Sequence, residues 1–152
     1  SGCDHYCNGC QNPETWDTKS GIPFDNTAIE EIFKQLDNDY ISGITFSGGD
    51  PLNENNRVEV CSLISKIKSR YGNSKSIWIY TGYTWNEIIE EAFPILTDIL
   101  LNTNVIVDGM FQKDLADVNY HWAGSTNQRV IDVQRSLEEK KIVLYKDGIN
   151  ND

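Results

Sequence analysis

Residues 41–51, ISGITFSGGDP, place a short apolar run directly before a pair of glycines and an acid. We expect Gly43 to Phe46 to form a buried strand, because the run is short and stops at a turn signal. Residues 76–82 (SIWIYTG) and residues 104–109 (NVIVDG) repeat this arrangement further along the chain. Helical patterns separate these stretches, so the sequence predicts an α/β fold with a mostly parallel sheet, open or curled into a barrel. In such folds, polar residues that directly follow strands gather at the edge where active sites are built.

Three segments show the apolar periodicity of amphipathic helices: residues 25–39, 55–72 and 84–93. We expect Asn26 or Thr27 to cap the first helix and Gly72 to end the second. A further strand is predicted at residues 130–133 (VIDV), followed by an apolar stretch at residues 141–145 (KIVLY). The 152 residues contain no repeat or linker, which predicts a single domain over residues 1–152.

The charge and composition exclude several classes of function. A net charge of -10 argues against nucleic-acid binding, which needs clustered Lys and Arg. No apolar run is long enough to span a membrane, so we expect no membrane contact. Four cysteines, three of them crowded together, do not resemble a secreted disulfide framework. These features predict a protein of the reducing cytoplasm.

The spacing of three cysteines is the strongest chemical signal in the chain. Cys3, Cys7 and Cys10 all lie within residues 3–10, whereas Cys61 lies on the apolar stripe of the second predicted helix. A structural zinc site would need a fourth ligand from His5 or His121, and His5 is poorly placed between two cysteines. An iron–sulfur cubane normally has four cysteine ligands, so three would leave one iron open to a substrate or cofactor. The cysteines alone leave zinc as an alternative.

Other motifs carry a resemblance to a known family. The cysteine spacing resembles that of the radical S-adenosylmethionine superfamily, and CNGCQNPETW with FSGGDPL resembles its glycyl-radical-enzyme activases. Within that branch, SGGDPL, YTGY, VDGMF and GSTNQRVIDV are similar to the anaerobic ribonucleoside-triphosphate reductase activating proteins. The resemblance implies a partial (βα) barrel of the radical S-adenosylmethionine type. It also implies that the chain lacks the family's first strand, and so is N-terminally truncated.

The resemblance further implies a set of site residues. Cys3, Cys7 and Cys10 would hold a 4Fe-4S cluster, and the SGGDP turn would receive the amino group of S-adenosylmethionine. Thr81 and Asp108 are expected near the ribose or the carboxylate, although a structural hydrogen bond is the alternative for Asp108. The residues expected to contact the cofactor are Gly9, Cys10, Gln11, Ser47, Gly48, Gly49, Asp50, Thr81 and Asp108. No side chain is expected to act as an acid or base.

The activity implied is one-electron chemistry. A cluster reduced by an electron from a flavodoxin-like donor would cleave S-adenosylmethionine. The resulting radical would remove a hydrogen atom from a backbone glycine of the anaerobic reductase large subunit. One alternative is an activating enzyme of another glycyl radical enzyme, such as pyruvate formate-lyase. Another is a non-catalytic iron–sulfur or zinc module.

A loop at residues 110–129 is expected to dock the partner enzyme, because it carries Phe111, Tyr120 and Trp122 beside polar residues. The alternative is that these aromatic side chains pack inward and anchor the loop. Residues 125–129 either line the cofactor, dock the partner or form a hydrogen-bonded loop.

Overall fold

A computed structural model describes residues 3–5, 7, 25–47, 49–91, 94–117, 122–123 and 125–145. Its centre is one four-stranded sheet in the order β1-β2-β3-β4, which does not close into a barrel within these residues. The strands are β1 (Gly43–Phe46), β2 (Ser76–Tyr80), β3 (Val105–Asp108) and β4 (Arg129–Asp132). The first three are parallel and β4 is antiparallel to β3. The α/β class and the four predicted strands are therefore confirmed, in a mixed sheet.

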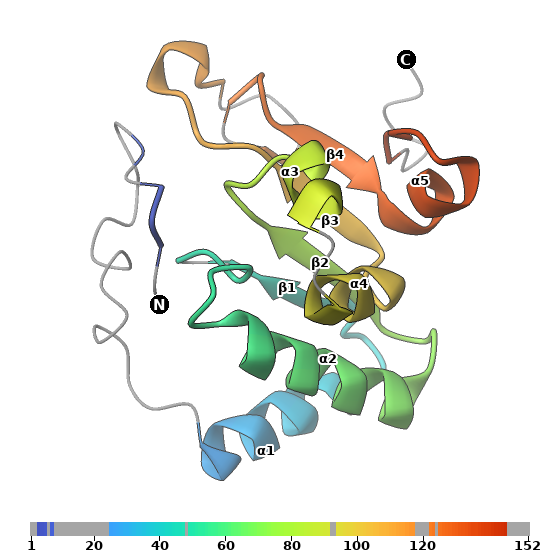
Figure 1. Ribbon diagram of the computed structural model, residues 1–152. Helices are drawn as coiled ribbons and strands as arrows, with labels where there is room; N and C mark the ends of the chain where they lie inside the picture. Colours follow the sequence, from blue (N-terminus) through green and yellow to red (C-terminus); the bar gives the residue numbers. More distant parts are fainter. Residues whose placement is uncertain are drawn as a thin grey trace.

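Helices cover one face of this sheet (Figure 1). The α-helices are α1 (Asn26–Leu36), α2 (Arg57–Tyr71), α3 (Trp85–Glu91), α4 (Pro94–Leu101) and α5 (Val133–Glu139), and a 3-10 turn, η2, covers Lys113–Leu115. The first three were predicted, whereas α4 and α5 were not. In α4 the sequence PILTDILL is nearly all apolar and lacks the polar face that marks a surface helix. In α5 the side chain of Asp132 caps the helix, so Val133 begins a helix and does not extend the strand.

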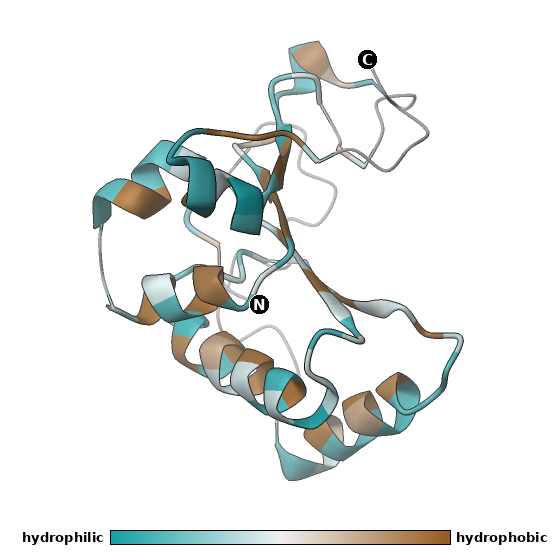
Figure 2. Ribbon diagram, turned by 90° about the vertical axis from the view of Figure 1, so that its right-hand side faces the viewer, coloured by the Kyte–Doolittle hydropathy of each residue, from teal (hydrophilic) through white to brown (hydrophobic). Residues whose placement is uncertain are grey.

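The core lies between the sheet and these helices. Ile77, Ile79 and Ile106 point to the helical face of the sheet and pack against Ile64 of α2 and Ile99 of α4. Figure 2 shows that hydrophobic residues alternate with hydrophilic ones along these helices. In its pairing with the sheet, the stretch at residues 141–145 forms an isolated bridge between Leu144 and Ile131. It therefore lies against β4 without forming a further strand.

The parallel register brings three strand ends to one edge. Phe46 pairs with Ile79, and Tyr80 pairs with Val107, so residues 47, 49–50, 81–83 and 109 follow their strands at the same edge. The backbone N–H of Thr81 donates to Val107 and that of Gly109 donates to Tyr83, which joins the turns after β2 and β3. The edge predicted to carry the site is thus assembled by the sheet itself.

The cap of α1 differs from the predicted one. The N-cap is Asp25, whose Oδ1 accepts a hydrogen bond of 3.1 Å from the backbone N–H of Ala28, whereas Asn26 and Thr27 lie inside the helix. The prediction of Asn26 or Thr27 was therefore wrong by one or two residues. An acid at the N-cap also places negative charge at the positive end of the helix dipole.

We predict that Asp25→Ala lowers the free energy of unfolding by about 0.5–2 kcal/mol, because it removes the cap. Thr27→Ala is the matched control and should be neutral or slightly stabilising, since Ala is the better helix former. Urea unfolding followed by circular dichroism measures both. The reverse order of stabilities would contradict the assigned cap.

Candidate functional site

The carboxylate of Asp50 is the centre of the edge formed by the strand ends. Its residue is only 2% exposed, and the carboxylate accepts hydrogen bonds from two successive turns. The backbone N–H of Leu52 donates to Oδ1 at 2.9 Å, and that of Gly82 donates to Oδ2 at 3.0 Å. The hydroxyl of Thr81 lies 2.8 Å from Oδ1 and 3.0 Å from Oδ2. Asp50 therefore holds the turn after β1 against the turn after β2.

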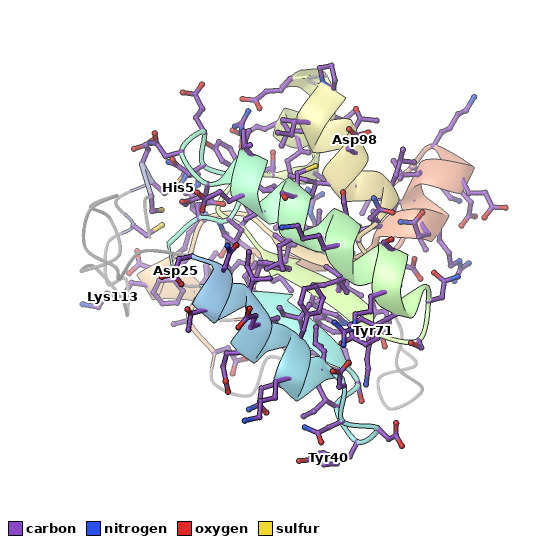
Figure 3. The ribbon with its side chains drawn as sticks, turned by 90° about the horizontal axis from the view of Figure 1, so that it is seen from below. His5, Asp25, Tyr40, Tyr71, Asp98 and Lys113 are labelled. Atoms are coloured by element: carbon purple, nitrogen blue, oxygen red, sulfur yellow. The ribbon has the colours of Figure 1, made fainter. Side chains whose placement is uncertain are left out.

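His5 supplies a further donor to this carboxylate. Its Nε2 lies 2.5 Å from Oδ2 of Asp50, and its ring meets the ring of Tyr83 edge-on at 4.7 Å between centroids. The hydrogen bond to Asp50 raises the pKa of His5, and the nearby carboxylates outweigh the opposite effect of its partial burial. Figure 3 shows His5 at the end of the molecule where α2 begins.

The neighbouring residue makes a second contact with the same loop. Nδ2 of Asn53 donates to Oδ2 of Asp4 at 3.0 Å, and Asn53 is itself buried. The segment that carries the first cysteines thus lies beside the loop between β1 and α2 (Figure 1). Sequence spacing alone did not predict this, because the contacts join residues 45 and 49 positions apart.

Thiols and the Asp50 network meet at this point. The ligand atoms of Cys3, His5 and Asp50 all lie within 4.8 Å of one another, and Cys3 and Cys7 are both partly buried. Cys10 lies outside the described residues. Soft thiolates partly shielded from water are the donors that an iron–sulfur cluster takes, so the two described cysteines fit such a group.

Cys61 has a different environment. It lies in the middle of α2 and packs against the hydrophobic core, as predicted from the apolar stripe. Burial raises the pKa of the Cys61 thiol, which favours the protonated form over the thiolate that binds metals. These features do not favour Cys61 as a ligand of the proposed site.

Asp108 is held by Arg129 and the start of α3. It is 1% exposed, and its oxygens accept from the backbone N–H groups of Trp85 (2.8 Å) and Arg129 (3.1 Å). The Arg129 guanidinium adds bonds of 3.2 Å from Nε and 2.7 Å from Nη2. These contacts correspond to the structural alternative considered for Asp108.

The loop at residues 125–129 is hydrogen-bonded throughout its described part. The Ser125 hydroxyl donates to Asn127, while the amides of Asn127 and Gln128 donate to the backbone carbonyls of Met110 and Gly109. Its polar side chains therefore bind the backbone of the segment that directly follows β3. Of the three uses considered for this loop, the hydrogen-bonded structure is the one observed in these contacts.

Trp122 packs against other aromatic side chains. Its ring lies 5.0 Å from that of Trp78 and 5.4 Å from that of Tyr145, and its backbone carbonyl accepts a bond of 2.6 Å from the Tyr80 hydroxyl. Because Trp78 and Tyr80 alternate with Ile77 and Ile79 along β2, this aromatic group lies on the face away from the helices. The packing corresponds to the anchoring alternative for Trp122; Tyr120 lies outside the described residues.

The remaining predicted residues divide into two groups. Ser47 is exposed and Gly49 is partly buried, and both line a cavity of about 410 Å³ beside Asp50. Gly9, Cys10, Gln11 and Gly48 lie outside the described residues. Sequence reasoning considered His5 only as a poorly placed zinc ligand and gave Gly82 no separate role, although Gly82 directly followed a strand.

Within the described residues, no helix is long and apolar enough to cross a membrane.

Comparison with known proteins supports an iron–sulfur assignment for this region. The family described as "4Fe-4S single cluster domain" matches residues 1–131. The anaerobic ribonucleoside-triphosphate reductase-activating protein of Enterobacteria phage T4 is 38% identical over 130 residues, covering 86% of this chain and 78% of that protein. The protein of the same name from Escherichia coli (strain K12) is 39% identical over 132 residues, covering 86% and 82%. That from Pasteurella multocida is 36% identical over 130 residues, covering 84% and 80%. No solved structure matches the chain significantly.

We predict that Asp108→Asn lowers the free energy of unfolding by about 1.5–3 kcal/mol, the range for a hydrogen bond to a charged group. The buried carboxylate orders both β4 and the start of α3, so the loss should affect the fold as a whole. Asp114→Asn, in the exposed turn η2, is the control and should change stability by less than about 0.5 kcal/mol. An unchanged stability in Asp108→Asn would mean that this carboxylate is available to a ligand.

Proposed function

This chain belongs to the family of anaerobic ribonucleoside-triphosphate reductase-activating proteins, and we propose that it generates a glycyl radical on such a reductase. The proposed reaction is the reductive cleavage of S-adenosylmethionine at a 4Fe-4S cluster, in a partial (βα) barrel of the radical S-adenosylmethionine type. The observation that carries the proposal is the approach of Cys3 to the Asp50 carboxylate, with ligand atoms within 4.8 Å. This proximity supports the proposal, because a cluster held by Cys3 would then lie next to the turn proposed for the cofactor's amino group.

Cys3, Cys7 and Cys10 would hold the cluster, and the turn at residues 47–50 would hold the methionine end of S-adenosylmethionine. Glycine at 48 and 49 would allow backbone carbonyls to approach an ammonium closely, while Asp50 supplies negative charge nearby. Gly9 and Gln11 are proposed to lie beside the adenine. When bound, the cluster and S-adenosylmethionine supply the one-electron chemistry.

The protein's own contribution is positioning. Asp50 is fixed by backbone donors from two turns, so its carboxylate does not need to reorganise when a cation arrives. Thr81 is better placed to hold Asp50 than to contact the cofactor directly, because its hydroxyl already donates to that carboxylate. Asp108 has its bonds to Arg129, so we propose that it supports the site from the neighbouring strand.

The proposed partners are the large subunit of the anaerobic reductase and a flavodoxin-like electron donor, in the cytoplasm. The names of the relatives favour the reductase over pyruvate formate-lyase as the enzyme activated. A zinc module built on Cys3, His5 and Asp50 is the second candidate, because these three groups gather at one point. Iron analysis separates the two.

We predict that Cys3→Ala, Cys7→Ala and Cys10→Ala each abolish the cluster, because only two thiolates would remain to hold it in the protein. Cys61→Ala is the matched control and should keep the full iron content. Anaerobic reconstitution followed by iron and sulfide analysis measures all four variants. Zinc bound in place of iron, or loss of the cluster in Cys61→Ala, would contradict the assignment.

We predict that the reconstituted, reduced protein produces an electron paramagnetic resonance signal of a glycyl radical on the anaerobic reductase when S-adenosylmethionine is added. The same assay should yield 5′-deoxyadenosine by chromatography, and Cys7→Ala should yield neither product. Pyruvate formate-lyase, offered separately, is the comparison substrate. A radical on the lyase alone would replace the reductase with the alternative partner.

A further inference from the structure

Two consecutive residues attach the cysteine segment to the loop between β1 and α2. Asp4 accepts from Asn53 at 3.0 Å, and His5 donates to Asp50 at 2.5 Å. The loop residues of both pairs are buried, at 1% exposed for Asn53 and 2% for Asp50. The two bonds therefore connect a segment that bears thiols to a rigid part of the sheet edge.

The ring of His5 occupies a site that only glycine at position 82 permits. A Cβ atom on Gly82 would lie 2.4 Å from Cδ2, 2.6 Å from Nε2 and 2.7 Å from Cγ of the imidazole. These separations are shorter than any real contact, so a side chain there would displace the ring from Asp50. Tyr83 meets the ring edge-on from the same turn. The turn after β2 is thus shaped around His5.

The hydrogen bond from His5 joins a group of donors to the Asp50 carboxylate that otherwise belong to the sheet edge. Three of the donors to this carboxylate, Leu52, Thr81 and Gly82, come from the turns after β1 and β2. His5 comes from the cysteine segment. Its hydrogen bond is therefore a direct link between the Asp50 carboxylate and the thiol-bearing segment.

We propose that His5 is a positioning residue that sets the placement of the cluster-bearing segment relative to the turn at residues 47–50. This inference rests on the proposed function. A cofactor that binds the cluster with one group and the turn with another must span the two, so its affinity depends on their separation. The cluster depends only on its own cysteines. Loss of His5 therefore weakens S-adenosylmethionine binding and leaves cluster assembly intact.

The test compares His5→Ala, His5→Gln and Gly82→Ala with the wild-type protein after anaerobic reconstitution. Iron and sulfide per chain are measured first, followed by the dissociation constant for S-adenosylmethionine from its effect on the electron paramagnetic resonance spectrum of the reduced cluster. We expect full iron in every variant. We expect affinity to fall about ten- to a hundred-fold in His5→Ala and Gly82→Ala, the range for a lost bond to a charged group. His5→Gln keeps an N–H donor and should recover most of the affinity.

A double variant separates positioning from general damage. In Gly82→Ala the new methyl group acts by displacing His5, so adding His5→Ala to it should cause no further loss of affinity. Additive losses would mean that the two residues act independently, which overturns the proposal. Thermal unfolding of the unreconstituted proteins compares the stabilities of the His5 variants. If affinity across these variants simply follows their stability, the positioning role of His5 is overturned as well.

The remaining outcomes are distinct. Loss of iron in His5→Ala would make His5 a metal ligand and overturn its positioning role. Unchanged affinity in His5→Ala, with wild-type binding intact, would overturn the inference and leave the proposed function standing. If the wild-type protein with full iron does not bind S-adenosylmethionine, the proposed function itself fails.

Discussion

The carboxylate of Asp50 is buried at the edge of the sheet, and a buried charge is stable only when hydrogen-bond donors surround it. Here the donors come from three separate parts of the chain: the loop after β1, the turn after β2 and the cysteine segment. If any of these segments moves away, its hydrogen bond to the Asp50 carboxylate is lost. Satisfying one charge therefore fixes the cysteine segment relative to the two turns at the edge of the sheet.

The sheet makes this arrangement possible. Parallel pairing of β1 with β2 places Phe46 beside Ile79, so Asp50 and Gly82 follow their strands at the same edge. Core packing behind the strands supplies the stability, since Ile77, Ile79 and Ile106 are fully buried against the helices. The polar edge can then be specialised for binding, because apolar burial elsewhere holds the strands in register.

Features encoded locally could be predicted from the sequence, whereas features that depend on distant contacts could not. The strands were predicted because apolar runs and turn residues are local signals, and α2 was predicted to end at Gly72, where it does end. The helices α4 and α5 were missed, since an apolar run without a polar face does not reveal its period and Asp132 serves both a strand and a cap. His5 was considered as a metal ligand and set aside because it lies between two cysteines. Its bond to Asp50 was not predicted, since nothing within its own segment indicated a partner 45 residues away.

The two buried acids of the sheet edge show why equivalent positions acquire different roles. Asp50 and Asp108 both follow or end a parallel strand, and both are almost inaccessible to water. Asp108 is matched by the fixed positive charge of Arg129 on the neighbouring strand, which gives a pair with no need of a further cation. The described contacts of Asp50 are neutral backbone groups, the Thr81 hydroxyl and one imidazole, and the charge of the imidazole depends on pH whereas that of Arg129 does not. The two carboxylates therefore differ in the partner that each one meets: Asp108 meets a permanent cation on the adjacent strand, and Asp50 meets a titratable ring from the cysteine segment.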